Sequence, residues 1–103
     1  MRIEHHEEGR LHHYECWDDY GCSIVASAVV LERDGYAYLQ DINVGSSHRG
    51  NGIGTGLLNQ ILADFEGRHI IADVFEDRIP WYKKHGFEQI GKAKQLVKIF
   101  RSP

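Results

Sequence analysis

The sequence has no long apolar run, no excess of basic residues and few cysteines, and each absence excludes a class of protein. Its longest hydrophobic stretch, residues 24–31, is interrupted by Ser27, whereas a membrane-spanning helix needs about 20 apolar residues. The net charge is −3 and the pI is 6.1, whereas domains that bind nucleic acid usually carry a net positive charge on a basic surface. We therefore expect neither a membrane protein nor a nucleic-acid-binding protein.

The first eight residues also lack the apolar segment of a secretory signal peptide, since they include two histidines and three glutamates. We therefore expect a cytoplasmic protein in which the two cysteines, Cys16 and Cys22, are thiols. These cysteines flank a short loop closely enough to face each other, so a disulfide stays open as the alternative.

Length and composition indicate one globular domain. Of the 103 residues, 42% are hydrophobic and 26% are charged, as in folded proteins. A single core usually comprises roughly 100–150 residues, so we expect one domain over residues 1–103. A chain of this length has little room to enclose both a cofactor and a second substrate.

Turn residues divide the first half of the chain into segments rich in β-branched and aromatic residues, the pattern of an antiparallel meander. Strands are expected at residues 2–8, 11–17, 22–31 and 36–44, with Asp34-Gly35 as the turn between the last two. In a meander of this kind, each strand pairs with the strand before it.

After Val44 the apolar period changes to that of a helix, which is expected from about Gly52 to Glu66 and is ended by Gly67. The apolar run at residues 69–75 then predicts a buried, parallel strand. The helix therefore connects two neighbouring strands as a βαβ unit.

The last third of the chain predicts a short helix and a hairpin. Asp77 is expected to cap a helix that ends at Gly86, and strands at 87–90 and 95–100 are joined around Gly91-Lys92. The predicted fold class is therefore α+β, a mixed and mostly antiparallel sheet with a central βαβ unit and two helices.

A glycine-rich loop, Arg49-Gly50-Asn51-Gly52-Ile53-Gly54, lies between the strand at 36–44 and the long helix. Its glycines allow successive N–H groups to point to one spot, and the helix N-terminus adds unpaired donors and a positive dipole end. Arg49 adds a charge that can bind a pyrophosphate. The loop thus predicts an anionic cofactor, with a turn that binds nothing as the alternative.

Two common phosphate-binding loops do not fit this spacing. A Walker A loop ends in Gly-Lys-Ser/Thr, but Thr55 follows Gly54 directly. The dinucleotide fingerprint Gly-x-Gly-x-x-Gly does not fit at its last position. That position is Thr55 if the motif starts at Gly50 and Leu57 if it starts at Gly52. A dinucleotide-binding fragment stays open as a weaker alternative, because Asp73 lies at a suitable distance along the chain to bind ribose.

The loop resembles the acetyl-CoA signature of the GNAT N-acetyltransferase superfamily, Gln/Arg-x-x-Gly-x-Gly/Ala, at Arg49, Gly52 and Gly54. Residues 39–44 resemble the bulged fourth strand of that family, and Pro-Trp-Tyr-Lys-Lys-His-Gly-Phe at 80–87 resembles its last-helix block. The resemblance covers residues 22 to 100. It implies acetyl transfer from acetyl-CoA to a primary amine, without a metal.

The resemblance also implies roles for particular residues. Tyr82 matches the tyrosine that protonates the leaving thiolate, although an aromatic that only packs on its helix is the alternative. Asp41 is the candidate base, directly or through water, or else an exposed strand carboxylate. The implied cofactor-binding residues are Asn43, Val44, Arg49, Gly50, Asn51, Gly52, Ile53, Gly54 and Thr55.

Two positions depart from the family pattern. Gln40 stands where relatives of the polyamine acetyltransferases have glutamate, and Phe75 stands where many members have asparagine. In such folds the fourth and fifth strands splay apart around the thioester, which predicts Gln40–Val44 on one side of the gap and Ile71–Phe75 on the other.

The seven histidines do not predict a metal site. His5 and His6, like His12 and His13, point to opposite faces of a strand, so neither doublet is a ready chelate. His6 and His13 can still meet across a hairpin. We expect solvated surface histidines, with His48 beside the phosphate loop.

The leading hypothesis is an N-acetyltransferase whose acceptor amine attacks acetyl-CoA directly. The acceptor can be a small amine, a polyamine, a protein lysine or a protein N-terminus. The alternative is an inactive CoA-binding or protein-interaction module of the same fold. Typical members have about 150 residues and two helices before the meander, whereas no helical period precedes Cys22. We therefore expect an open acceptor site, completed by a homodimer or by a bulky protein substrate.

Overall fold

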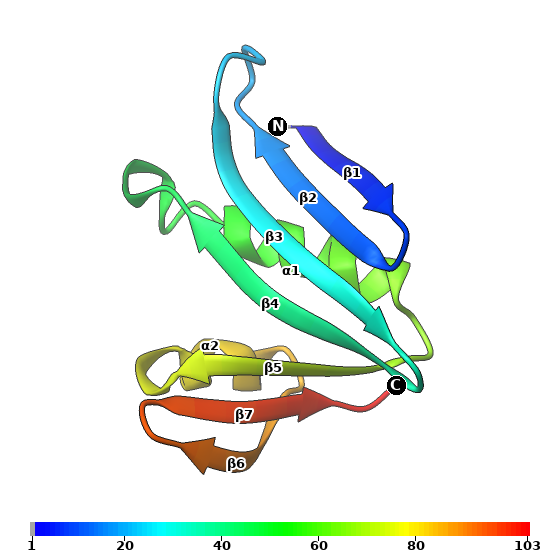
Figure 1. Cartoon of the computed structure of the whole chain (residues 1–103). Coiled ribbons are helices and arrows are strands. Elements are labelled where there is room, and N and C mark those ends of the chain that lie inside the picture. The colour runs from blue at the N-terminus through cyan, green and yellow to red at the C-terminus, as the bar shows by residue number, and fades with distance from the viewer. Residues whose placement is uncertain (1) are drawn as a thin grey trace.

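A computed structural model describes residues 2–103, except for the side chain of Asp41. Within these residues the elements are β1 (Arg2–Glu8), β2 (Leu11–Trp17), β3 (Ile24–Arg33), β4 (Tyr36–Val44), a 3-10 turn (Ser46–His48), α1 (Ile53–Asp64), β5 (His69–Phe75), a second 3-10 turn (Glu76–Arg78), α2 (Ile79–Lys84), β6 (Glu88–Ala93) and β7 (Leu96–Arg101). The strands form one sheet in the order β1-β2-β3-β4-β5-β7-β6 (Figure 1). Within the described chain, neither helix is long and apolar enough to cross a membrane.

The sheet has the expected class. Only β4 and β5 pair in parallel, and α1 connects them as the helix of a βαβ unit. The other neighbouring strands are antiparallel. A mixed, mostly antiparallel sheet with two helices is therefore confirmed, and the strand bounds in the first half agree with the expected ones to within two residues.

Two local expectations are wrong. Gly91 does not form the turn between β6 and β7 but lies inside β6 at an irregularity opposite Lys98. The turn follows Ala93, because Ala93 still pairs with Leu96, and Lys94 takes a positive φ of 58° there. Asp77 does not cap α2, because it belongs to the 3-10 turn that leaves β5, and Arg78 is the residue that precedes the helix.

Helix α1 packs one apolar side against the meander. Leu57, Leu58 and Ile61 are completely buried, and α1 contacts β2, β3 and β4. These residues recur at helical spacing, so they share one face. Burying each such side chain contributes roughly 1.5–3 kcal/mol, which makes this helix face a main part of the core.

The hairpin of β1 and β2 is tied to the C-terminal end of α1. Tyr14 on β2 is completely buried, and its hydroxyl donates to Asp64 at 2.8 Å. His5 on β1 stacks on the Tyr14 ring, with centroids 4.3 Å apart. Farther along β2, Cys16 is buried and Cys22 is exposed in the following loop, and both are free thiols.

Strands β4 and β5 separate after a short region of pairing. Their pairing runs from Tyr36 with His69 to Leu39 with Ala72. Just beyond it, the register between β3 and β4 shifts so that Gln40 is the extra residue of a bulge. The gap is therefore bounded by residues 40–44 and 73–75, and the expectation that it begins at residue 71 is wrong because residues 71 and 72 still pair with β4.

A polar network spans the sheet where the gap begins. The Tyr38 hydroxyl donates to Asp73 at 2.5 Å, and Lys98 on β7 lies 3.1 Å from the same carboxylate. Tyr38 and Asp73 are diagonal neighbours on β4 and β5, which lets a long side chain bridge them. The network holds three strands together at the position where backbone pairing between β4 and β5 ends.

Replacing Tyr14 with phenylalanine tests the link between the hairpin and α1. The variant keeps the buried ring but loses the hydrogen bond to Asp64, so we expect it to lose about 1 kcal/mol of unfolding free energy. Urea denaturation measures the difference. Tyr20→Phe is the control because Tyr20 is 89% exposed, and equal stabilities for the two variants would contradict the assignment.

A second prediction concerns alkaline pH. Burial and the hydrogen bond to Asp73 raise the pKa of Tyr38 from 10.0 to about 12. The folded chain therefore keeps this proton at a pH where the unfolded chain loses it, so the stabilisation is full below about pH 10 and is lost as the pH rises toward 12. Unfolding free energies measured from about pH 9 to 11 should fall less steeply for Tyr38→Phe than for the unmodified chain.

The control for this measurement is Tyr20→Phe, which removes a hydroxyl from a residue that is 89% exposed. It should retain the pH dependence of the unmodified chain. If Tyr38→Phe declines as steeply as the control, the Tyr38–Asp73 bond does not couple ionisation to stability.

Candidate active site

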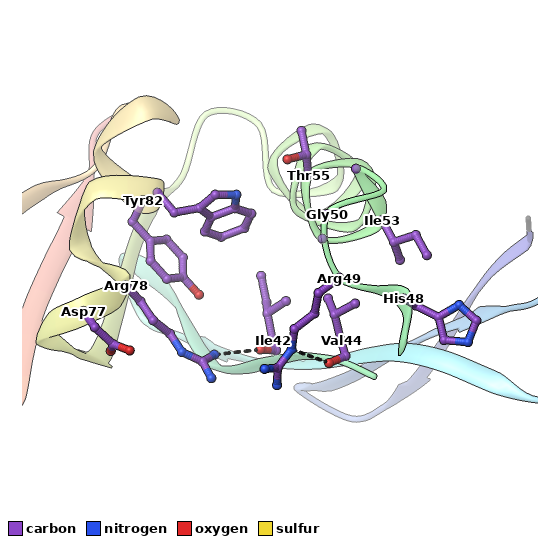
Figure 2. Close-up of a pocket in the computed structure, with 13 residues that line it drawn as sticks. Ile42, Val44, His48, Arg49, Gly50, Ile53, Thr55, Asp77, Arg78 and Tyr82 are labelled. Atoms are coloured by element: carbon purple, nitrogen blue, oxygen red, sulfur yellow. Dashed lines mark hydrogen bonds between the residues drawn. The ribbon is translucent and has the colours of Figure 1, made fainter. Parts of the chain in front are cut away.

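A cavity of about 530 Å³ lies between β4 and the two helices. Strand β4 forms its floor, the N-terminal end of α1 and the loop before it form one wall, and α2 forms the other (Figure 2). The lining residues are Ile42, Val44, His48, Arg49, Gly50, Gly52, Ile53, Gly54, Thr55, Asp77, Arg78, Trp81 and Tyr82.

The cavity follows from the separation of β4 and β5. Beyond Leu39 the edge of β4 that faces β5 has no backbone partner on that strand. Two arginines donate to carbonyls there: Arg49 Nε to Val44 at 3.2 Å and Arg78 Nη1 to Ile42 at 3.3 Å (Figure 2). An unpaired strand edge can pair with an extended ligand, so this edge can hold a chain-like molecule inside the cavity.

The loop before α1 has the backbone of an anion-binding site. Gly50 and Gly52 take positive φ values of 84° and 77°, a conformation that costs other residues roughly 1–2 kcal/mol. Gly52 is the N-cap of α1, without a side-chain capping bond, and the first turn of the helix holds no acidic residue. The first N–H groups and the positive dipole end therefore favour an anion.

Gly54 lies where the first turn of α1 comes close to both β4 and α2. A Cβ atom at this position would lie 3.3 Å from Val44 Cγ2 and 3.6 Å from Trp81 Cζ2. The first distance is tighter than ordinary van der Waals contact, so with a side chain here Val44 would have to move by a few tenths of an ångström. Glycine thus allows the helix N-terminus to approach both the strand and α2.

Tyr82 belongs to the buried core and also lines the cavity. The residue is 3% exposed, and its ring meets Trp81 and Phe87 edge to face with centroids 4.8 and 5.2 Å apart. Its hydroxyl points into the cavity between α2 and β4 (Figure 2). Packing against the neighbouring rings fixes the direction of this phenol.

Most of the expected cofactor-binding residues line this cavity. Val44, Arg49, Gly50, Gly52, Ile53, Gly54 and Thr55 do so, together with Tyr82. Asn43 and Asn51 are exposed and are not among the lining residues. The side chain of Asp41, the candidate base, lies outside the part of the chain that the structure describes.

Sequence reasoning missed four residues of the cavity, Ile42, Asp77, Arg78 and Trp81. Alternation along β4 could have found Ile42, because it lies two residues before Val44. The sequence predicts Asp77 as a helix cap, not as a cavity residue, and Trp81 adjoins Tyr82. No local sequence pattern predicts Arg78 as a cavity residue, because its contact with β4 depends on the tertiary fold.

Comparisons with known proteins agree with this geometry. The family model of the acetyltransferase (GNAT) domain matches residues 10–89. Escherichia coli ElaA is similar over 92% of this chain and 70% of its own, with 17% identity and a TM-score of 0.80. An acyl-CoA N-acyltransferase from Pseudomonas aeruginosa is similar over the same shares of the two chains, with 17% identity and a TM-score of 0.78.

A third solved structure is described as histone acetyltransferase HPA2 and related acetyltransferase from Corynebacterium glutamicum. It is similar over 92% of this chain and 66% of its own, with 21% identity and a TM-score of 0.78. This chain therefore spans about two thirds of the length of these structures. The match to the family model over most of the chain shows that this protein belongs to the GNAT acetyltransferase family.

Proposed function

We propose that the protein transfers an acetyl group from acetyl-CoA to a primary amine. The observation that carries this proposal is the cavity at the strand split, which has an anion-binding helix N-terminus on one side and the Tyr82 phenol on the other. Family membership supports the use of an acyl-CoA in general. We further propose that the acyl group is acetyl, that the acceptor is an amine, and that individual residues have the roles given below.

On the cofactor side, the glycine loop and the first turn of α1 would hold the pyrophosphate. Gly50, Gly52 and Gly54 supply backbone N–H groups or the space for a close approach, and Arg49 supplies charge. Ile42 and Val44 would border the pantetheine arm along the open edge of β4. This arrangement directs the thioester toward α2.

The reaction needs a deprotonated amine, donors for the oxyanion and a proton for the leaving thiolate. The amine nitrogen attacks the thioester carbonyl, and the tetrahedral intermediate collapses to an amide and the CoA thiolate. Tyr82 then gives its phenolic proton to that thiolate. Backbone N–H groups near Asn43 and Val44 stabilise the oxyanion, and Asp41 accepts the amine proton directly or through water.

The acceptor reaches the split from the sheet face that the helices leave open. Tyr38, Asp73 and Lys98 lie at the start of the gap, and Phe75 beside it is 54% exposed. A protein acceptor, or a second copy of this chain, would supply the wall that the described residues do not form on this side. Mass-spectrometric screening for acetylated products identifies the acceptor class.

A second candidate function keeps the fold without catalysis. Gln40 replaces a glutamate found in related enzymes, and Phe75 is an exposed aromatic where relatives have asparagine. Both departures favour a module that binds CoA or a protein partner. Release of free thiol from acetyl-CoA in the presence of varied amines separates an enzyme from such a module.

Acetyl-CoA should stabilise the folded protein. A ligand at about 100 times its Kd adds roughly 2.7 kcal/mol, and each kcal/mol raises the Tm of a domain of this size by about 4–8 °C. Gly54→Val should abolish the shift, because the new side chain meets Val44 and Trp81. A thermal melt with and without acetyl-CoA measures both effects.

The matched control for this test is Gly91→Ala on β6, where the new Cβ atom would lie an ordinary 3.8 Å from Lys98. It should keep the full shift. The absence of any shift for the unmodified chain at millimolar acetyl-CoA would show that the cavity does not bind this cofactor.

Tyr82→Phe tests the proton donor separately from binding. The variant retains the ring that packs on Trp81 and Phe87, so the acetyl-CoA thermal shift should persist. We expect kcat to fall by about 100-fold or more, as on loss of a general acid. Unchanged turnover would remove Tyr82 from the mechanism even if the protein is an acetyltransferase.

A further inference from the structure

A second cluster of functional groups lies on the β1–β2 hairpin, at the opposite end of α1 from the cavity. His5 Nε2 and His12 Nδ1 are 2.7 Å apart, and the Glu7 carboxylate lies 3.9 Å from each of these atoms. His5 and Glu7 share a face of β1 by alternation, and His12 is the register partner of Glu7 on β2. Three ligand-type atoms therefore converge on one point.

The far nitrogen of each histidine faces a carboxylate. His12 Nε2 lies 2.9 Å from Glu32 on β3, and His5 Nδ1 lies 3.6 Å from Asp64 on α1. An ionised carboxylate only accepts, so the 2.9 Å contact places the His12 hydrogen on Nε2, whereas the 3.6 Å between His5 and Asp64 is an electrostatic contact that is too long for a hydrogen bond. His12 Nδ1 then presents a lone pair, and either a hydrogen on His5 Nε2 or a cation bound to both nitrogens bridges the 2.7 Å between the two rings.

The surroundings hold both rings in place. His12 is 4% exposed and meets the edge of Phe65 with centroids 4.9 Å apart. His5 stacks on Tyr14 with its ring tilted by only 12°, and the Tyr14 hydroxyl donates to Asp64, which also faces His5. Residues from β2, β3 and α1, together with Phe65 just after that helix, thus hold the two imidazoles before any ion binds.

We propose that His5, Glu7 and His12 bind one divalent transition-metal ion of the Zn²⁺ type. Zn–N distances of about 2.0–2.1 Å and tetrahedral angles place ligand atoms roughly 3.3 Å apart, between the 2.7 and 3.9 Å of this cluster. Imidazole with one carboxylate suits Zn²⁺, Co²⁺, Ni²⁺ or Cu²⁺, whereas Ca²⁺ and Mg²⁺ prefer all-oxygen sites. Glu32 and Asp64 act as the outer partners that orient metal-bound histidines.

Water completes the coordination at this site. The Glu7 side chain is 63% exposed, so the side of the cluster away from His12 is open to solvent. Three protein ligands leave the fourth tetrahedral position to a water molecule. The ion would join β1 and β2 directly, and β3 and α1 through Glu32 and Asp64, which fastens the hairpin to the rest of the sheet.

The other face of the same hairpin offers an internal comparison. His6 Nε2 lies 3.5 Å from Glu4 and 3.1 Å from Glu15, and the His6 side chain is 59% exposed. This group has one imidazole, which lies beside two carboxylates. It lacks the second histidine and the outer carboxylates, so we assign the metal to the His5–His12 side.

The test uses the full chain without a histidine tag, after removal of metals by a chelator. Calorimetric titration with ZnCl₂ should show one tight site per chain, and Co²⁺ should give the absorption bands of a tetrahedral complex. Glu7→Gln and His5→Ala should each weaken Zn²⁺ binding at least about tenfold, since even the loss of an outer partner costs about 10–100-fold. His6→Ala should bind as the unmodified chain does.

Circular dichroism of each variant confirms that the fold is intact, and the buried His12 is left unchanged for that reason. Glu32→Gln provides a further readout, because it alters only an outer partner and should also weaken binding about 10–100-fold. If the unmodified chain binds Zn²⁺ no more tightly than His5→Ala, a shared proton holds the two rings and the proposal is wrong. An equal loss in His6→Ala would overturn it as well.

Discussion

The separation of β4 from β5 is the constraint on which the candidate active site depends. Parallel pairing ends at Leu39 and Ala72, next to the bulge at Gln40. A bulge increases local twist and redirects a strand, so the second half of β4 turns away from β5 while keeping its pairing with β3. Each strand is then followed by a 3-10 turn and a helix, and the two helices border the gap from opposite sides.

Helix α1 runs between the two proposed sites, with its N-terminus at the cavity and its C-terminus at the His5–His12 cluster. Its N-terminus has Gly52 as the cap and no acidic residue in the first turn, which leaves a positive end toward the cavity. Its C-terminal residue, Asp64, instead accepts from Tyr14 and faces His5. One element therefore presents backbone donors at the proposed cofactor site and a carboxylate at the proposed metal site.

The sequence predicts most of the elements because their signals are local. Alternation and the Asp34-Gly35 turn locate β3 and β4, and the change of period after Val44 locates α1. The turn between β6 and β7 is misplaced because Gly91 signals a turn as readily as a bulge, and only cross-strand pairing distinguishes the two. Asp77 is misassigned for a similar reason, since an acidic residue before a helix suits both a cap and a 3-10 turn.

Residues brought together by tertiary structure are the ones that local reasoning misses. The cavity role of Arg78 depends on the distance between α2 and β4. The sequence leaves open a meeting of His6 and His13, which lie directly opposite each other in register. The contact forms instead between His5 and His12, which are diagonal neighbours on the face toward α1, and burial of His12 overturns the expectation that all these histidines are solvated.

The two arginines at the split explain how a strand edge can stay open in a folded protein. A carbonyl without a hydrogen-bond partner destabilises the fold when it is shielded from water, and Arg49 and Arg78 supply donors to Val44 and Ile42. In the proposed reaction, amide groups of the pantetheine arm take over such positions, so hydrogen bonds are exchanged rather than added. Net binding energy then comes from the pyrophosphate at α1 and from apolar contacts with the cavity lining. In this proposal the shape of the cavity beside Tyr82 positions the thioester carbonyl.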